Sequence, residues 1–285
     1  MATFTYSDFK KMYPNVNACL DKIFNLRYGH LTECPECNSA VAWRKVRTRR
    51  CYQCRHCYAQ FYPTAGTVFE KTTTPLLDWF YVIFLFTTTR NGVAAKEIER
   101  QLGCSYKCAW RMGHCIRKLM DKIGVDKLKG FVEIDETYNG SKKSGRGLKD
   151  KTPVVGMVER LGNVKAFAVE NATRENIYPL IEQHVDKTAK VSTDESLVYY
   201  TLKSELGYNH GTINHSAGEY RRGQVSTNTI EGFFGQLKRM VHGTHLHVSK
   251  KYLQNYVGEC VLRYNNRKRQ HEMFEIILTH LPSFR

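Results

Sequence analysis

The sequence predicts an α/β protein whose main domain is a mixed β-sheet with helices on both faces, preceded by a small metal-binding ribbon and a pair of helices. Two Cys-x-x-Cys pairs near the N-terminus predict the ribbon, and apolar helical spacing between residues 75 and 120 predicts the helical region. After Gly130 the pattern changes to short apolar runs alternating with helical segments. With 285 residues, one large domain plus smaller modules is expected. The predicted parts are an N-terminal helical segment (1–30), the ribbon (31–70), the helix pair (71–125), the α/β domain (130–270) and a C-terminal helix or tail (271–285).

The charge balance narrows the classes of partner. Lys and Arg total 43 against 27 Asp and Glu, a net charge of +16. Such a basic protein most often binds a polyanion, with nucleic acid the first candidate, although an RNA-associated protein or simple solubility charge is the alternative. The start of the chain lacks the pattern of a signal peptide, and the longest apolar run, Trp79–Phe86, is far shorter than the about 20 residues of a membrane span. We therefore expect a soluble intracellular protein with no membrane partner, acting in the nucleus of a eukaryotic host or the cytoplasm of a bacterial one.

The first 30 residues and the cysteines after them can be interpreted locally. Tyr6–Tyr28 has a rough apolar face and is predicted to be helical. Cys34 and Cys37 are followed, after sixteen residues, by Cys54 and Cys57, which is the spacing of a two-knuckle zinc site. The alternative is a set of free buried thiols. A ribbon of this size is too small to bury a hydrophobic core of its own. A structural Zn²⁺ would therefore largely take the place of that core.

Cys51 leaves the second knuckle open, because it also stands three residues before Cys54. We favour Cys54 with Cys57, since a loop-like segment then follows each knuckle. Arginines surround the ribbon, and a basic ribbon is suited to phosphate contact, although a solvated face is the alternative. The candidates are Arg47, Arg49 and Arg50.

The helical region resembles a helix-turn-helix. Ala94–Leu102 and Tyr106–Met120 are predicted helices, Gly103 falls in the turn, and Ser105 is a plausible N-cap. A basic second helix would suit the major groove of DNA, whereas the alternative is an ordinary helical hairpin. Its basic residues are Lys107, Arg111, Arg117 and Lys118.

The α/β domain has a predicted element order. Strands are expected at 131–138, 153–158, 164–169, 189–193 and near 212–215, and helices at 175–184, 197–206, from near Thr227 and from near Ser249. This order resembles that of the ribonuclease H-like fold. A cationic loop, expected to be flexible and to reach a DNA backbone, lies between the first two strands and carries Lys142, Lys143 and Arg146.

Three acids lie on three separate predicted elements of this domain. Asp135 lies within the first strand, Asp194 follows the fourth, and Glu231 is near the start of a late helix. Charges rarely occupy sheet cores unless they are paired or hold a metal. Three acids on three elements suit a two-metal phosphoryl-transfer site with two Mg²⁺ or Mn²⁺ ions. Glu136 should point to the opposite face and be structural.

Several motifs together resemble the zinc-ribbon insertion-sequence transposases related to Merlin elements, over roughly residues 13–267. They are Cys34-Pro35-x-Cys37, Tyr52-Gln53-Cys54-x-x-Cys57, Pro63-Thr64-Ala65-Gly66-Thr67, Ile134-Asp135-Glu136-Thr137-Tyr138, Thr227-Asn228-x-Ile230-Glu231-Gly232-Phe233 and Arg263-Tyr264-Asn265. The resemblance implies a DDE-type recombinase that binds transposon terminal inverted repeats, cuts them and joins the 3′-hydroxyl to target DNA. Pairing two ends implies at least a homodimer. The chain departs from the family at Ser226, where His is usual, and at Phe234, where Trp is usual.

The third metal ligand has two candidates, since family members use either Asn or Glu there. Asn228 and Glu231 lie about one helical turn apart. Glu231 and Lys238 share a helix face, whereas Asn228 lies about 80° from Lys238, so we favour Glu231. Lys238 and Arg239 would hold terminal DNA phosphates, and His215, Arg221 and Arg222 would line the DNA path. The alternatives are a domesticated, non-catalytic DNA-binding protein and a nuclease of the same fold.

Overall fold

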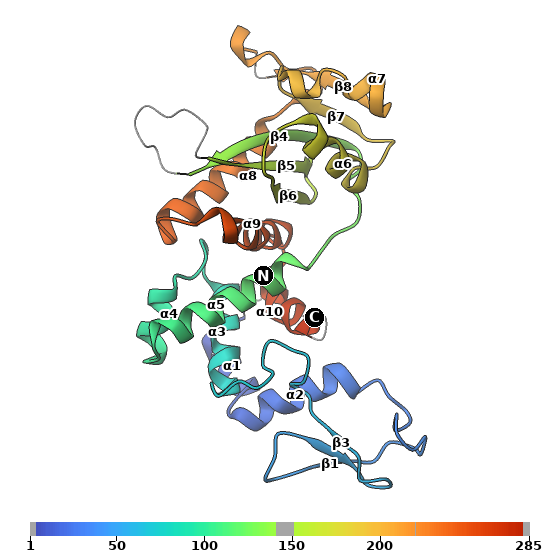
Figure 1. The fold of residues 1–285 in the computed structure, drawn as a ribbon, viewed down its shortest axis with the longest axis vertical. Helices are drawn as coiled ribbons and strands as arrows, with labels where there is room; N and C mark the ends of the chain where they lie inside the picture. The colour runs from blue at the N-terminus through green and yellow to red at the C-terminus, as the bar shows by residue number, and fades with distance from the viewer. Residues whose placement is uncertain (1–3, 141–150, 220, 282–285) are drawn as a thin grey trace. The chain divides into compact units, whose positions relative to one another are not determined.

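The structure is a computed structural model that describes residues 4–140, 151–219 and 221–281. The described residues fall into two compact units (Figure 1). The first unit contains the chain up to Thr89, the segment Ala95–Leu119 and the residues from Arg269 onward, and the second contains Arg90–Ala94 and Met120–Lys268. The predicted cationic loop, with Lys142, Lys143 and Arg146, lies outside the described residues.

The first unit begins with two helices where the sequence predicted one. α1 spans Tyr6–Met12 and α2 spans Val16–Tyr28. Pro14 has no amide hydrogen to continue the first helix, and Asn15 has extended backbone angles. The Asn15 side chain accepts a hydrogen bond from the amide of Ala18 at 3.1 Å, so it caps a new helix. The Pro-Asn pair therefore divides the apolar stretch.

A three-stranded antiparallel sheet follows, in the order β1 (Trp43–Lys45), β2 (Tyr52–Cys54) and β3 (Gln60–Phe61). Aromatic rings join it to α2. The rings of Phe24 and Tyr52 stack with centroids 3.7 Å apart, and those of Trp43 and Phe61 pack edge to face at 4.9 Å. The expectation that a metal would largely replace a core is therefore incomplete, because α2 supplies an aromatic core for the ribbon.

The remaining helices of the first unit are α3 (Leu76–Thr88), α4 (Ala95–Leu102), α5 (Tyr106–Asp121) and α10 (Met273–Thr279). α3 contains the apolar run Trp79–Phe86 and is mostly buried. Gly103, with φ of +62°, forms the turn between α4 and α5, and the Ser105 hydroxyl accepts from the amide of Cys108 at 3.3 Å, which confirms the predicted cap. Arg117 is buried beside the ring of Phe86, so it does not belong with the exposed cations of α5. Among the described residues, no helix has the length and apolar character needed to cross a bilayer.

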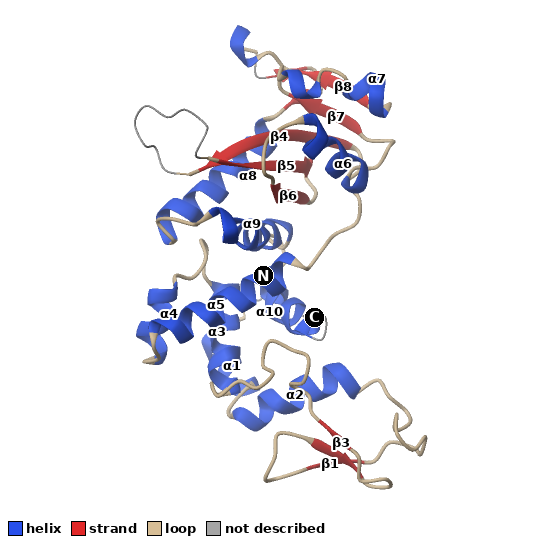
Figure 2. Ribbon diagram, viewed as in Figure 1, coloured by secondary structure: helices blue, strands red, loops and turns tan. Residues whose placement is uncertain are grey.

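The second unit contains a five-stranded mixed sheet in the order β6-β5-β4-β7-β8 (Figure 2). The strands are β4 (Phe131–Asn139), β5 (Thr152–Glu159), β6 (Val164–Ala168), β7 (Lys190–Thr193) and β8 (Asn209–Thr212). β4, β5 and β6 pair antiparallel, whereas β7 runs parallel to both β4 and β8. The mixed sheet expected from the sequence is confirmed.

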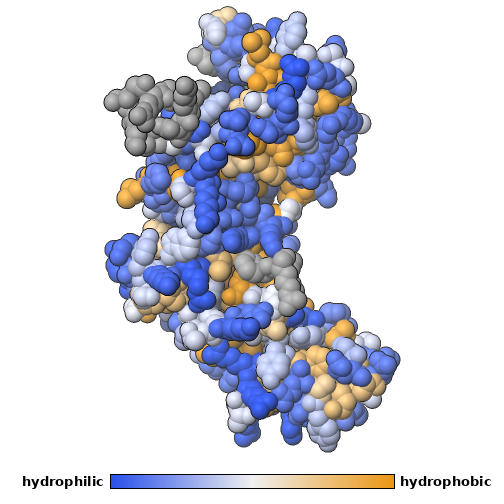
Figure 3. Space-filling view, in the orientation of Figure 1, coloured by the Kyte–Doolittle hydropathy of each residue, from blue (hydrophilic) through white to orange (hydrophobic). Residues whose placement is uncertain are grey.

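Helices cover both faces of this sheet (Figure 1). On one face, α6 (Arg174–His184) and α7 (Leu202–Leu206) pack over a core that includes Ile134, Val155 and Ile177. On the other face, α8 (Asn228–Arg239) and α9 (Lys250–Asn265) pack over Val154 and Val158. Hydrophilic residues cover much of the visible surface of each unit (Figure 3).

Two local predictions in the second unit were wrong, and one hairpin was not predicted. The last strand, expected near residues 212–215, is β8 and ends at Thr212, because its position follows from pairing with β7. His215 instead begins a 3-10 turn, η2 (His215–Ala217). The predicted helix 197–206 is divided into a 3-10 turn, η1 (Leu197–Tyr199), and α7. A short hairpin of β9 (Arg221–Arg222) and β10 (Val225–Ser226) was not predicted.

Candidate functional site

Strand register brings Asp135 and Asp194 to neighbouring positions. In the parallel pair β4–β7, Glu133 lies beside Ser192. Two residues further along each chain, Asp135 and Asp194 therefore reach the same level, with Asp194 just beyond the end of β7. Adjacent strands are about 4.8 Å apart, and in-register partners project from the same face of a sheet. The register, extended by two residues, therefore places both acids on the face that α8 covers, and the charge of Asp194 raises the pKa of Asp135.

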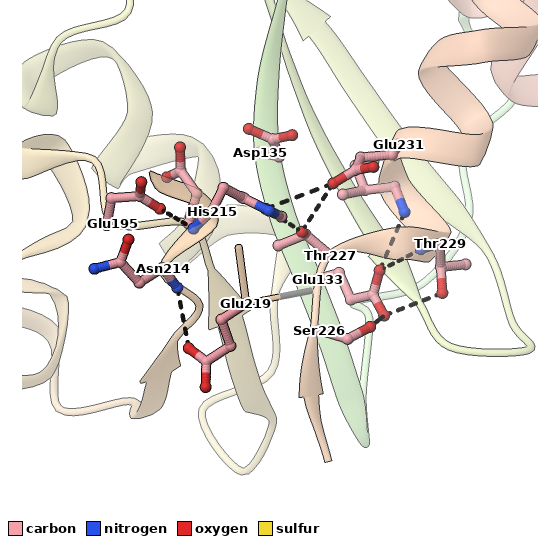
Figure 4. A network of polar contacts seen from close by, with 12 residues as sticks. Glu133, Asp135, Glu195, Asn214, His215, Glu219, Ser226, Thr227, Thr229 and Glu231 are labelled. Carbon is pink, nitrogen blue, oxygen red and sulfur yellow. Dashed lines mark hydrogen bonds and ion pairs between the residues drawn. The ribbon is translucent and has the colours of Figure 1, made fainter. Parts of the chain in front are cut away.

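Close packing of α8 on β5 brings Glu231 to the same place. Gly156 is the partner of Asp135 in the β4–β5 pair. A Cβ atom on Gly156 would lie 2.7 Å from Ile230 Cδ1 and 2.8 Å from a Phe234 ring carbon, so the absence of a side chain lets the helix approach. Glu231 is the next residue on α8. Figure 4 shows Asp135, His215 and Glu231 close together.

Electrostatics in this cluster oppose negative charge. Burial raises the pKa of Asp135 to about 7, against a hydrogen bond from the amide of Glu136, and the charges of Glu136, Asp194 and Glu231 raise it further. Burial also raises the pKa of Asp194, although the amide of Ser196 donates to its Oδ1 at 3.1 Å. A divalent cation would relieve this repulsion, so the donor set fits an oxygen-preferring metal such as Mg²⁺.

The acids are spread more widely than a single ion requires. Among the described residues, only the cysteines Cys34, Cys37, Cys54 and Cys57 form a group of three or more potential metal ligands, and their sulfur atoms lie within 4.8 Å of one another. Mg²⁺ retains several waters and uses one or two carboxylates per ion, so carboxylates on separate elements remain suitable for a pair of ions.

The two candidates for the third ligand have different surroundings. Glu231 Oε1 accepts from the hydroxyl of Thr227 at 3.1 Å and lies 3.6 Å from His215 Nε2. Asn228 and Glu231 are both exposed near the start of α8, so the contacts of Glu231, and not its burial, distinguish it. Lys238 and Arg239 are exposed in the last turn of the same uninterrupted helix.

Glu133 is a site residue that the sequence analysis missed. We expected the buried carboxylate of the first strand to be Asp135, but Asp135 is only partly buried, and Glu133 is the acid with 0% exposure. Arg160 donates to Glu133 Oε1 through Nε at 3.0 Å and Nη2 at 2.8 Å. Because residues two apart on a strand share a face, the pair Glu133 and Asp135 was the available signal.

Glu133 also binds the N-terminus of α8 (Figure 4). Its Oε2 accepts from the amides of Thr229 at 2.7 Å and Ile230 at 3.1 Å, and its Oε1 accepts from the hydroxyl of Thr229 at 3.0 Å. The first turn of a helix has free amide donors and favours an anion. This contact holds the N-terminus of α8 against β4, two residues before Asp135. It therefore sets the position of Glu231, which lies in the first turn of α8.

Glu136 lies on the opposite face, as predicted. Its Oε2 accepts from the hydroxyl of Tyr199 at 2.7 Å, and Tyr199 is fully buried in the core under α6. Burial raises the pKa of Glu136 despite that hydrogen bond. The acid beside Asp135 therefore has a separate structural partner.

The four predicted cysteines of the ribbon converge. Sγ atoms lie 3.8 Å apart for Cys34 and Cys57, and 3.9 Å apart for Cys37 and Cys54. A tetrahedron of thiolates around zinc, with Zn–S bonds of about 2.3 Å, has edges of about 3.8 Å, so the spacing fits Zn²⁺. Cys51 lies outside the group and its Sγ contacts Gln60, which resolves the second knuckle in favour of Cys54 and Cys57.

The two knuckles have matching backbone geometry. In the first, the amide of Asn38 donates to the carbonyl of Cys34 at 2.8 Å, and in the second the amide of Tyr58 donates to that of Cys54 at 3.1 Å. Asn38 and Tyr58 both have positive φ, 55° and 65°, which turns the chain just after each second cysteine. Local sequence therefore shapes each knuckle.

The predicted DNA-contacting cations are mostly exposed. Lys45, Arg47, Arg49 and Arg50 line a hollow of about 600 Å³ between the β1–β2 loop and α2. Lys107 and Arg111 are exposed on α5, and Arg221 and Arg222 are exposed on β9. Arg111 also lies 5.5 Å from the ring centre of Trp79, which restricts its side chain.

Comparison with known proteins follows the division seen in the fold. Residues 127–265 match a family model described as the ISXO2-like transposase domain, and residues 14–60 match one described as the transposase zinc-ribbon domain. A Halobacterium salinarum protein, described as an uncharacterized protein in transposable element ISH50, is 26% identical over 274 residues, covering 89% of this chain and 92% of its own.

One solved structure is also similar. A chain in the cryo-EM structure of the simian T-cell lymphotropic virus intasome with PP2A regulatory subunit B56 gamma aligns with 62% of this chain and 64% of its own, at 14% identity and a TM-score of 0.33.

The two family matches define the class, a protein of mobile DNA with a zinc-ribbon module ahead of a transposase domain. Residues 127–265 belong to the ISXO2-like transposase domain family, and residues 14–60 belong to the transposase zinc-ribbon family.

Proposed function

We propose that the chain is a DNA transposase that binds the terminal inverted repeats of its element, cleaves them by phosphodiester hydrolysis and joins the 3′-hydroxyl to target DNA. The observation that carries the proposal is the parallel register of β4 and β7, which, extended by two residues, places Asp135 beside Asp194. The strand order β6-β5-β4-β7-β8, with helices on both faces, supports a ribonuclease H-like domain.

Asp135, Asp194 and Glu231 would hold two Mg²⁺ or Mn²⁺ ions. Bound there, the ions would activate water or a DNA 3′-hydroxyl and stabilise the leaving oxygen of an in-line displacement. The contacts of Glu231 with Thr227 and His215 favour it over Asn228 as the third ligand. Glu133 and Arg160 would hold α8 at the correct depth on β4.

DNA would be bound by cations from both units. Arg47, Arg49 and Arg50 surround the hollow in the ribbon, and α4 with α5 would act as a helix-turn-helix through Lys107 and Arg111. In the second unit, Arg221, Arg222, Lys238 and Arg239 would contact phosphates near the acids. The four cysteines would hold a structural Zn²⁺ that keeps the ribbon folded. Because two transposon ends must be paired, we expect a homodimer or a higher homo-oligomer.

Asp135→Asn tests the proposal, on DNA carrying the ends of the element, with and without Mg²⁺. Strand cleavage should be lost, whereas DNA binding should remain, because the substitution removes a ligand charge without touching the cationic surfaces. Glu205→Gln, in an exposed pair with Arg174, is the control and should cleave normally. Cleavage by Asp135→Asn would contradict the assignment. An inactive wild-type chain that binds the ends would indicate a domesticated DNA-binding protein, and equal cutting of unrelated DNA would indicate a nuclease.

A further inference from the structure

A short chain of hydrogen bonds reaches Glu231 from the segment after β8. His215 Nε2 lies 3.0 Å from Thr227 Oγ1, and that hydroxyl donates to Glu231 Oε1 at 3.1 Å (Figure 4). A threonine hydroxyl has a single hydrogen. Since Glu231 receives it, the hydrogen on the His215–Thr227 contact must belong to Nε2. The imidazole therefore donates to Thr227, which donates to Glu231.

Both donors are held in place. Thr227 is fully buried at the start of α8. His215 lies in η2, whose amides bind a neighbouring acid: Glu195 accepts from the amide of His215 at 2.9 Å and from the amide and hydroxyl of Ser216 at 3.0 and 2.6 Å. Because Glu195 follows Asp194 directly, this contact fastens the His215 turn to the residue after the second acid.

We propose that His215 is a positioning residue, which acts through Thr227 to aim the Glu231 carboxylate at Asp135 and Asp194. The proposal rests on the proposed function, in which Glu231 is a metal ligand. An exposed carboxylate near the start of a helix can adopt several rotamers, and a hydrogen-bond donor in a fixed position favours one of them. Donors that orient a metal-binding carboxylate contribute strongly to metal affinity.

His215 Nε2 does not itself serve as a metal ligand in this arrangement. A neutral imidazole binds a metal through a nitrogen lone pair, and here Nε2 carries a hydrogen that is directed to Thr227. The sequence predicted that His215 lines the DNA path. In the structure its Nε2 is directed toward Thr227 and Glu231.

The experiment measures Mn²⁺ binding to the full-length, zinc-loaded chain by EPR titration, without DNA. Thr227→Val keeps the shape of the side chain but removes the hydroxyl, and His215→Ala removes the first donor. Each should weaken Mn²⁺ binding by about 10- to 100-fold. The double variant should be no weaker than Thr227→Val alone, because both substitutions break one chain of bonds.

Conservative variants separate positioning from folding. Thr227→Ser keeps a hydroxyl, and His215→Gln places an amide near the position of Nε2, so both should bind Mn²⁺ nearly as tightly as the wild type. His247→Ala, at an exposed histidine of the same unit, should change nothing. Thermal unfolding followed by circular dichroism identifies any variant that fails to fold, and the two conservative variants then decide the result.

The outcomes separate this proposal from the proposed function. If Mn²⁺ binds and Asp135→Asn abolishes binding, but Thr227→Val binds normally, the positioning role is wrong and the metal site stands. Nitrogen coupling to bound Mn²⁺ that disappears in His215→Ala would make His215 a ligand and also overturn it. If the wild type binds no Mn²⁺ in a manner that depends on Asp135, both proposals fail.

Discussion

Gly156 lies directly opposite Asp135 in the antiparallel pair of β4 and β5, and α8 packs into the space that a side chain would occupy. Gly156 therefore lets α8 approach β5 directly opposite Asp135. The same helix carries Glu231. Phe234 has its ring over this glycine.

We predict that Gly156→Ala displaces α8 and impairs the site. The new Cβ would meet Ile230 and Phe234 at under 3.0 Å, and overpacking of this kind costs about 1–3 kcal/mol. Chemical denaturation should show that loss, together with weaker Mn²⁺ binding. Gly232→Ala is the matched control, because nothing lies within 4 Å of its added carbon and alanine favours a helix, so stability should stay the same or rise. A Gly156→Ala chain with unchanged stability and Mn²⁺ affinity would contradict the role given to this packing.

Glu133→Ala should be much more damaging than loss of a surface acid. It removes the partner of Arg160 and of two amides of α8, and breaking a buried ion pair by removing one member costs about 3–5 kcal/mol. The comparison is Glu182→Ala, which breaks an exposed pair with Lys187 worth about 0–1 kcal/mol. Urea denaturation of both variants measures the difference. If the two variants lose similar stability, Glu133 does not anchor α8.

The features that the sequence predicted well depend on local signals. The two knuckles follow from cysteine spacing, and β4 and β5 follow from apolar runs with turn residues around them. Pro14 and Asn15 are also local signals, and they indicate the break between α1 and α2. The apolar pattern of residues 6–28 nevertheless led to the prediction of a single helical stretch.

The features that it missed depend on packing between distant segments. Glu133 finds its amide partners on α8, nearly 100 residues later, and nothing in the strand alone indicates which acid will be buried. The close approach at Gly156 likewise requires α8 to be in place. The strand expected near residues 212–215 is β8 at Asn209–Thr212, because its pairing with β7 sets that position.

Zinc content should distinguish the neighbouring cysteines. Cys57→Ser removes one of the four converging thiols, so the chain should lose its zinc and the ribbon should unfold. Cys51→Ser alters a fully buried thiol outside the group, so it should keep one zinc per chain. Atomic absorption on the purified chains measures this directly. Zinc loss from Cys51→Ser with full retention in Cys57→Ser would reverse the assignment of the second knuckle.

The second unit should lose stability on mild acidification through His184. Burial lowers the pKa of His184 to about 4, and the charges of Lys165 and Lys127 lower it further; Lys165 Nζ lies 3.3 Å from its Nδ1. Between pH 6.5, its ordinary value, and about 4, the unfolded chain binds a proton that the folded chain does not, so the free energy of unfolding falls as the pH falls. His184→Gln should reduce the drop in Tm between pH 7 and pH 5, whereas the same change at the exposed His247 should leave the drop unaltered. An equal drop in wild type and His184→Gln would show that other groups govern the acid sensitivity.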